Sequence, residues 1–335
     1  MADIGFGIIG LGRIGSLHAD HLSGSIRGAR LIAAAVDSED RSRILASATA
    51  PCPLVANIDE LISHPEIGAV VVASPSSLHH QHIAQVAASG LAIFSEKPLA
   101  DSVAGGQLAA EAVERAGVPF QIGFQRRFDP GYVRARELIA AGAIGDVEMF
   151  RGITCDRIPP VDFLRTSGGL FWDLAIHDFD AARFLTGDEI EAVHAVGTVK
   201  VEPALRDFDD IDYGIVTLRF RGGALGVVQT SWRAPYGYDI RAEVHGSDGK
   251  IITEVDEKVP LHLYDARGLV VARHDQFVER FRLAYLAELQ AFVDCLHTAT
   301  PPSPGVWDGL AALNISDAAT RSRRQERWIN IDTHA

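Results

Sequence analysis

The first third of the chain alternates short apolar runs with helical stretches, and its first apolar run ends in a glycine-rich turn. Residues 4–9 form that run, and the sequence GLGRIG at residues 10–15 follows it and leads into a helical pattern. A glycine turn between a strand and a helix is typical of a βαβ unit. This feature predicts an α/β fold with a parallel sheet for the first third of the chain.

Further apolar runs continue the alternation. We predict strands at residues 30–36, 67–73, 92–95 and 118–122. Ligands of open parallel sheets bind at the carboxyl ends of the strands. Polar residues follow three of these ends, at Asp37, Ser74 and Glu96-Lys97-Pro98. The sequence therefore predicts a ligand site at this edge of the sheet.

The glycine turn predicts a dinucleotide site. Gly10 allows a tight turn, Gly12 lets the backbone approach a pyrophosphate, and Gly15 lets the helix pack closely on the strand. The helix N-terminus favours the anion. We predict that the cofactor-binding residues are Gly10, Gly12, Arg13, Ile14, Gly15, Asp37, Ser74, His79, Glu96 and Lys97.

Asp37 indicates which dinucleotide binds. It lies 22 residues after Gly15, where its carboxylate would accept hydrogen bonds from ribose hydroxyl groups and repel a 2′-phosphate. We therefore expect NAD, while Arg41 and Arg43 leave NADP open as an alternative.

The rest of the chain has a different pattern. A helix is predicted at residues 130–141, strands joined by short turns fill residues 192–271, and helices are predicted at residues 281–297 and 310–321. Successive strands with short turns predict a mainly antiparallel, open sheet. We expect a dinucleotide domain at residues 1–124 and a substrate-binding and oligomerisation domain at residues 125–335, so that the chain is α/β in class.

Asp173 and His177 are four residues apart in a helical pattern, so one helix would place both on one face. A carboxylate beside an imidazole suits proton transfer, because the acid fixes the tautomer of the ring. A histidine satisfied in the core is the plain alternative. A metal site that also includes Asp180 is a less favoured one, and we expect no metal.

Lys97 and the histidines after Ser74 allow two interpretations each. Lys97 is either an ordinary surface lysine or an ammonium group that donates to a reacting oxygen at the cofactor edge. His79, His80 and His82 fit solvated or cofactor-adjacent residues better than zinc ligands.

The net charge, the lengths of the apolar runs and the number of cysteines argue against several classes of protein. A net charge of −13 argues against a nucleic-acid partner, and the arginines between Arg321 and Arg327 fit a solvated helix face. No apolar run reaches the ~20 residues that cross a membrane, and the N-terminus has no basic leader. Three scattered cysteines, which we interpret as packing residues, suit a reduced, cytoplasmic protein.

With these residues in place, the chain resembles the glucose–fructose oxidoreductase / inositol dehydrogenase / rhizopine-catabolism (Gfo/Idh/MocA) family, and most of all its inositol dehydrogenase branch. The matching motifs are Glu96-Lys97-Pro98, residues 123–129 (GFQRRFD), residues 167–180 with Asp173 and His177, and residues 236–239 (YGYD). The chain departs from the branch at Gln125, at Arg157-Ile158 and at Trp172.

The resemblance implies an N-terminal Rossmann domain with a doubly wound parallel sheet, a C-terminal α/β domain with an open antiparallel sheet, a function and a set of site residues. Lys97, Asp173 and His177 would be the catalytic triad, and Arg127, Asp156 and Tyr236 would join Asp173 and His177 in holding a polyol. The expected activity is oxidation of a cyclic polyol with NAD, above all of myo-inositol to 2-keto-myo-inositol (scyllo-inosose), in a homotetramer. The alternatives are another inositol isomer, an aldose or sugar derivative, and a non-catalytic regulator that binds dinucleotide.

Overall fold

The computed structural model describes residues 2–36, 52–254, 257–266 and 268–331. The chain forms two compact units, Met1–Gln125 with Leu283–Leu313 and Arg126–Arg282 with Asn314–Ala335. The N-terminal part of the first unit ends at Gln125, one residue beyond the predicted end of the dinucleotide domain. Residues 283–313 group with the first unit, whereas the sequence prediction had assigned all of residues 125–335 to a second domain.

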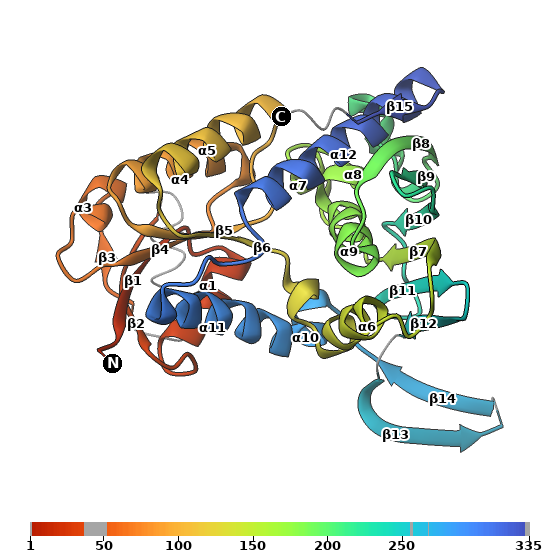
Figure 1. Ribbon diagram of the computed structural model, residues 1–335, viewed down its shortest axis with the longest axis horizontal. Helices are drawn as coiled ribbons and strands as arrows, with labels where there is room; N and C mark the ends of the chain where they lie inside the picture. The colour runs from red at the N-terminus through yellow and green to blue at the C-terminus, as the bar shows by residue number, and fades with distance from the viewer. Residues whose placement is uncertain (1, 37–51, 255–256, 267, 332–335) are drawn as a thin grey trace. The chain divides into compact units, whose positions relative to one another are not determined.

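The first unit, the nucleotide unit, contains a six-stranded sheet in the order β3-β2-β1-β4-β5-β6 (Figure 1). All neighbouring strands pair in parallel, as the alternation of strands and helices predicted. The strands are β1 (Ile4–Ile9), β2 (Ala29–Ala35), β3 (Leu54–Val55), β4 (Ala69–Val72), β5 (Ala92–Glu96) and β6 (Phe120–Gly123). The two-residue β3 was not predicted.

Helices cover both faces of this sheet, with α4 and α5 on one face and α1 and α11 on the other (Figure 1). The ring of Phe292 on α11 packs edge-on against Phe6 at 6.2 Å and against Phe94 at 5.9 Å. These contacts explain why residues 283–313 belong to the first unit: α11 buries apolar side chains on its sheet. The helices are α1 (Arg13–Leu22), α3 (Ile58–Ile62), η1 (Ser76–Leu78), α4 (His79–Ala88), α5 (Val103–Ala116), α11 (Arg282–Thr298) and the first part of α12 (Val306–Gln325).

The second unit contains a seven-stranded sheet in the order β12-β11-β7-β10-β9-β8-β15. Strands β7 and β10 are parallel and every other neighbouring pair is antiparallel, which confirms the mainly antiparallel sheet. The strands are β7 (Val147–Cys155), β8 (Ile190–Thr198), β9 (Tyr213–Phe220), β10 (Leu225–Ser231), β11 (Asp239–Gly246), β12 (Gly249–Thr253) and β15 (Ile329–Asn330). A separate hairpin consists of β13 (Glu257–Asp265) and β14 (Gly268–Arg273).

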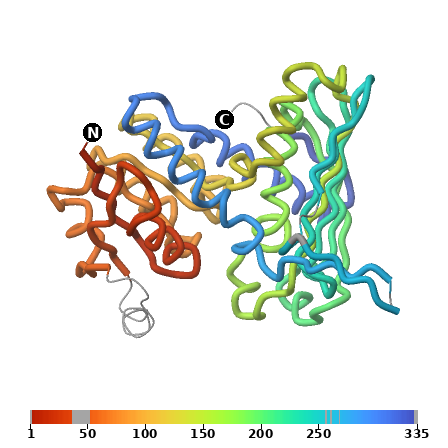
Figure 2. Tube along the Cα trace, turned by 90° about the horizontal axis from the view of Figure 1, so that it is seen from below, coloured from red at the N-terminus to blue at the C-terminus, as the bar shows by residue number. Residues whose placement is uncertain are grey.

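The helices of the second unit lie on one face of this sheet (Figure 2). Along β9 the side chains of Val216, Leu218 and Phe220 are buried toward those helices, while Ile215 is 48% exposed on the other face. The helical segments are η2 (Gln125–Phe128), α6 (Pro130–Ala140), α7 (Val161–Leu164), α8 (Leu170–Asp173), α9 (Ile176–Thr186), η3 (Pro203–Phe208), α10 (Phe277–Arg280) and the rest of α12. In the described part of the chain, no helix has the length and apolar character needed to cross a membrane.

Candidate active site

The glycine turn after β1 has the backbone geometry that a dinucleotide site requires. Gly10 has φ +91°, and a Cβ there would lie 2.6 Å from the carbonyl oxygen of Ala73. A Cβ on Gly15 would collide with the carbonyl oxygen of Gly10. At Gly12 there is open space where a Cβ would be. Two glycines are therefore needed for packing, while the third leaves the backbone open to a ligand.

Helix α1 begins directly after this turn, and no side chain caps its N-terminus. Its N-cap, Gly12, has no side chain to accept the first backbone N–H groups, and no acidic residue lies in the first turn. Such a terminus suits an anion, because unpaired N–H groups and the helix dipole both favour negative charge. Arg13 and Ile14 are the first two residues of this helix. The residues present therefore fit the pyrophosphate of a dinucleotide. Asp37, the predicted ribose ligand, lies outside the described residues.

His79 joins the ends of two neighbouring strands. It is buried, and its Nδ1 lies 2.6 Å from the carbonyl oxygen of Pro98 while its Nε2 lies 2.8 Å from that of Ser74. Burial lowers the pKa of His79, although the two carbonyl groups act in the opposite direction. The Ser74 side chain is bonded in turn to Nδ1 of His82 at 2.8 Å. Ser74 and His79, both predicted to bind the cofactor, thus form hydrogen bonds that hold the loops after β4 and β5 in place.

Lys97 is the accessible residue of a buried segment. Among residues 92–100, all of which the structure describes, the others are buried and Lys97 is partly exposed. The preceding residue, Glu96, is 7% exposed and accepts a hydrogen bond from Nε2 of His18 at 2.7 Å. Glu96 is therefore engaged inside the nucleotide unit, and its predicted contact with the cofactor stays a prediction.

Asp173 and His177 do not share one continuous helix, as the sequence pattern had predicted. Asp173 ends α8, residues 174 and 175 form a turn, and His177 is the second residue of α9. The backbone N–H of Ala175 donates to the carbonyl oxygen of Leu170, five residues back, so the regular helical pattern is interrupted. Among residues 170–182, which are all described, only Asp173 and His177 are not buried. The segment thus leaves an acid and an imidazole partly exposed in an otherwise buried framework, with Nδ1 of His177 itself buried.

Two further aspartates of this segment are bonded to arginines. Asp178 accepts from Nη1 of Arg126 at 2.7 Å and from the Thr154 hydroxyl at 2.9 Å. Burial acts to lower the pKa of Arg126, but the Asp178 carboxylate outweighs it and raises that pKa above its ordinary value. Burial raises the pKa of Asp178, and the Arg126 charge with the hydrogen bonds from Thr154 and Arg126 acts against that rise. The 2.7 Å contact with a guanidinium group favours the carboxylate form of Asp178, and the pair anchors the start of α9.

The second pair involves a predicted substrate residue. Nε of Arg127 donates to Oδ2 of Asp180 at 2.9 Å, and Nη2 donates to Oδ1 at 2.6 Å. The two oxygens of Asp180 are therefore engaged, which disfavours the metal site that would combine this residue with Asp173 and His177. The predicted contact of Arg127 with a polyol stays a prediction, and its side chain is 12% exposed.

Asp156 and Tyr236 lie near the carboxyl end of β7. Asp156 follows the last residue of that strand and accepts from the backbone N–H of Arg157 at 2.7 Å. The Tyr236 hydroxyl donates to Asp239 at 3.3 Å, and the Tyr236 side chain borders a cavity of about 380 Å³. Buried Tyr238 was not predicted, and burial followed by the charge of Asp156 raises its pKa. Neighbouring phenol and carboxyl groups of this kind suit binding of a hydroxylated ligand.

Sequence comparison identifies both units. Residues 4–124 match the model described as "Oxidoreductase family, NAD-binding Rossmann fold", and residues 132–252 match the GFO/IDH/MocA C-terminal domain. A myo-inositol 2-dehydrogenase of Thermotoga maritima is 37% identical over 97% of this chain and 98% of its own. The chain belongs to the GFO/IDH/MocA oxidoreductase family. The family assignment and the fit of the glycine turn make NAD its cofactor.

Two other similar proteins are named for scyllo-inositol instead of myo-inositol. A scyllo-inositol 2-dehydrogenase (NAD(+)) of Bacillus subtilis is 36% identical over 97% of this chain and 95% of its own. The crystal structure of scyllo-inositol dehydrogenase from Lactobacillus casei, with bound NAD(H) and scyllo-inositol, has a TM-score of 0.92. That enzyme is 29% identical to this chain, and the match covers 98% of this chain and 99% of the enzyme.

Proposed function

We propose that this chain is an NAD-dependent dehydrogenase that oxidises myo-inositol to 2-keto-myo-inositol. The observation that carries the proposal is the accessibility of Asp173 and His177 in an otherwise buried segment, in a chain 37% identical to a myo-inositol 2-dehydrogenase. An acid and an imidazole kept accessible by a rigid framework suit the transfer of a hydroxyl proton at neutral pH.

The proposed roles follow from the chemistry of each side chain. His177 accepts the proton of the reacting hydroxyl group, and Asp173 orients the imidazole and stabilises the imidazolium that forms. Lys97 donates a hydrogen bond to the oxygen as it becomes a carbonyl. NAD, when bound, supplies the acceptor for the hydride. Arg127, Asp156 and Tyr236 are proposed to hold the remaining hydroxyl groups.

A second candidate substrate is scyllo-inositol. It is favoured by the 36% identity to the enzyme of Bacillus subtilis that is named for it. The two substrates differ in the orientation of one hydroxyl group, so the same catalytic residues would serve both.

The test is reduction of NAD and NADP, measured by absorbance, with myo-inositol, scyllo-inositol, other inositol isomers and aldoses. We expect the highest kcat/KM with myo-inositol and NAD. A higher kcat/KM with scyllo-inositol or an aldose would make that compound the substrate in place of myo-inositol. If the protein binds NAD but oxidises no polyol or sugar, the alternative of a non-catalytic regulator would be favoured.

Variants test the catalytic roles. Lys97→Met and His177→Asn are each expected to lower kcat by about 10²–10⁴-fold, the range of general acid–base catalysis, while NAD still binds. Lys250→Met and His245→Asn change the same residue types elsewhere and should leave kcat within about twofold of the unaltered protein, as changes outside the reacting groups do. Near-normal turnover in either test variant would contradict the role given to that residue.

We also propose a homotetramer, assembled through the helix-free face of the seven-stranded sheet, in the cytoplasm. Support comes from exposed apolar side chains on its strands, Val196 on β8 and Ile215 on β9, which border a hollow of about 700 Å³. Exposed apolar surface of this kind favours association. Light scattering after size-exclusion chromatography should give four times the chain mass, and Ile215→Arg should lower it.

A further inference from the structure

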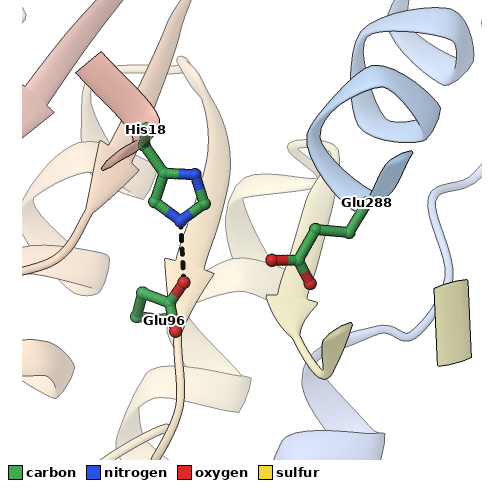
Figure 3. A group of neighbouring side chains, drawn as sticks. All are labelled: His18, Glu96 and Glu288. Carbon is green, nitrogen blue, oxygen red and sulfur yellow. Dashed lines mark hydrogen bonds and ion pairs between the residues drawn. The ribbon is translucent and has the colours of Figure 1, made fainter. Parts of the chain in front are cut away.

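Three side chains that the proposed chemistry does not use meet inside the nucleotide unit (Figure 3). His18 comes from α1, Glu96 from the end of β5 and Glu288 from α11. One nitrogen or oxygen atom of each lies within 4.8 Å of those of the other two. Exposure is 0% for His18, 7% for Glu96 and 0% for Glu288. Two carboxyl groups are therefore close together where water has almost no access.

The bonds within the cluster are unequal. Glu96 is bonded to Nε2 of His18 at 2.7 Å. Glu288 points toward this pair (Figure 3), yet neither of its carboxyl oxygens has a hydrogen-bond partner among the described residues. A buried carboxylate without a partner is very unfavourable, so such a group takes up a proton instead. The burial of Glu288 and the nearby charge of Glu96 both raise its pKa well above the ordinary value.

Among the described residues, no arginine or lysine acts on the charge of Glu288. Glu96 faces it from β5, and His18 and His21 are the titratable groups of α1 in this region, with their rings 6.4 Å apart. On its own helix, Tyr285 packs against His18 at 6.3 Å. Gln121 of β6 donates its side-chain amide to the backbone oxygen of Glu288 and not to its carboxyl group. None of these groups carries the permanent positive charge that would stabilise a second carboxylate.

We propose that Glu288 is a neutral carboxylic acid at neutral pH and acts as a positioning residue for the turn that contains Lys97. Its proton removes the repulsion between two buried carboxylates, so Glu96 keeps its bond to His18. Because Glu96 directly precedes Lys97, that bond links the helix of the glycine turn to the Lys97-Pro98 segment. The protonation state concerns the nucleotide unit alone and stands whatever the substrate is.

A divalent cation is the competing occupant, because one histidine and two carboxylates are a common ligand set. The direct bond between His18 and Glu96 favours the proton. A nitrogen that shares a hydrogen with a carboxylate has no lone pair left for a metal, and a cation would have to separate the pair.

Infrared difference spectroscopy tests the protonation state directly. The spectrum of the full chain minus that of Glu288→Gln, at pH 7, should contain the C=O stretch of a carboxylic acid. Glu114→Gln, on the exposed surface of α5, is the matched control and should remove only carboxylate bands. A carboxylate band in place of the acid band for Glu288 would overturn the proposal. So would one equivalent of tightly bound metal that Glu288→Gln loses.

Thermal unfolding against pH gives a second readout. A carboxyl group whose pKa is raised in the folded state binds more protons folded than unfolded, so its burial costs increasing stability as pH rises above its unfolded pKa. Between about pH 5 and 9, Tm should therefore fall further for the unaltered protein than for Glu288→Gln or Glu288→Met, while Glu114→Gln should follow the unaltered protein. Parallel curves for all four proteins would contradict the proposal.

The positioning role has its own kinetic signature. Glu288→Gln keeps a neutral group of the same size, so kcat and the KM for NAD should stay within twofold at pH 7. Ionisation of Glu288 would disturb the turn, so on raising the pH from 7 to 9 kcat should fall more for the unaltered protein than for Glu288→Gln. A loss of kcat in Glu288→Gln at pH 7 would contradict the role of a neutral acid, and identical pH profiles would contradict the positioning.

Discussion

Asp178→Asn should destabilise the second unit by about 3–5 kcal/mol, the cost of breaking a buried ion pair by removing one charge. Arg126 and Asp178 are 2% and 1% exposed, and the bond between them is 2.7 Å long. Asparagine keeps the volume and one acceptor, so the loss comes from leaving the Arg126 charge buried without an opposite charge. The remaining donor bond, from Nη2 of Arg126 to the Thr154 hydroxyl at 2.9 Å, leaves that charge unneutralised.

Urea unfolding followed by tryptophan fluorescence measures this cost. Of the four tryptophans, Trp307 belongs to the nucleotide unit, so a Trp307→Phe background restricts the signal to Trp172, Trp232 and Trp328 of the second unit. The control is Asp317→Asn, which breaks an exposed pair with Arg321 of 3.1 Å and should cost less than about 1 kcal/mol.

A double variant separates the charge effect from simple loss of packing. Arg126→Met with Asp178→Leu removes both charges and should recover most of the stability, since buried pairs are often replaceable by apolar residues. A loss below about 1 kcal/mol in Asp178→Asn would refute the reasoning, because that is the range of exposed pairs. A double variant no more stable than Asp178→Asn would also refute it.

Three shorter predictions concern the nucleotide unit. Gly15→Ala should cost about 1–3 kcal/mol through the collision of its Cβ with the Gly10 carbonyl, measured by thermal unfolding, and should weaken NAD binding in calorimetry. Asp37→Ala should lower the preference for NAD over NADP, measured as the ratio of the two kcat/KM values. Burial, followed by the charges of His79 and His80, lowers the pKa of His82 to about 4. The unfolded form therefore binds a proton first, stability falls as pH drops from about 6.5 to 4, and His82→Gln should lose less stability over that range in acid titrations.

Much of the fold was readable from local patterns. Strand β1 has the predicted bounds, Ile4–Ile9, because its apolar run is closed by Gly10. Helix α6, Pro130–Ala140, has a proline at its first position and an aspartate N-cap, Asp129, whose side chain accepts from two backbone N–H groups. Signals of this kind need no knowledge of distant residues, since each rests on neighbouring side chains.

The predicted helix around Asp173 was wrong for a reason that spacing cannot show. Gly168 and Gly169 have φ +85° and +100° and set the start of α8, and Leu170 then accepts the bond from Ala175 that ends it. The pattern of apolar residues is the same for one helix and for two short helices joined by a tight turn. Asp173 and His177 are nevertheless both partly exposed, although the helix is interrupted between them.

The cluster of His18, Glu96 and Glu288 could not be predicted from the sequence. Glu96 and Glu288 are 192 residues apart in the chain, and nothing in the pattern of α11 marks Glu288 as different from an exposed helix residue. Their contact arises because α11 packs on the sheet beside β5, through Phe292 and Phe94. Pairing of this kind is set by tertiary packing, and a single sequence carries no local sign of it.

In both units a proposed catalytic side chain is partly exposed within a segment that is otherwise buried. A side chain that donates a hydrogen bond to a substrate or takes its proton must stay accessible and still be held rigidly, and those demands conflict, since rigidity comes from burial. In the nucleotide unit Lys97 is the accessible residue of a segment whose other members are buried, and Glu96 beside it is bonded to His18. In the second unit His177 has the same relation to Asp178, which is bonded to Arg126. In both places a buried carboxyl group, bonded to a basic side chain from another element, fixes the backbone directly beside the residue that we propose to take part in the reaction.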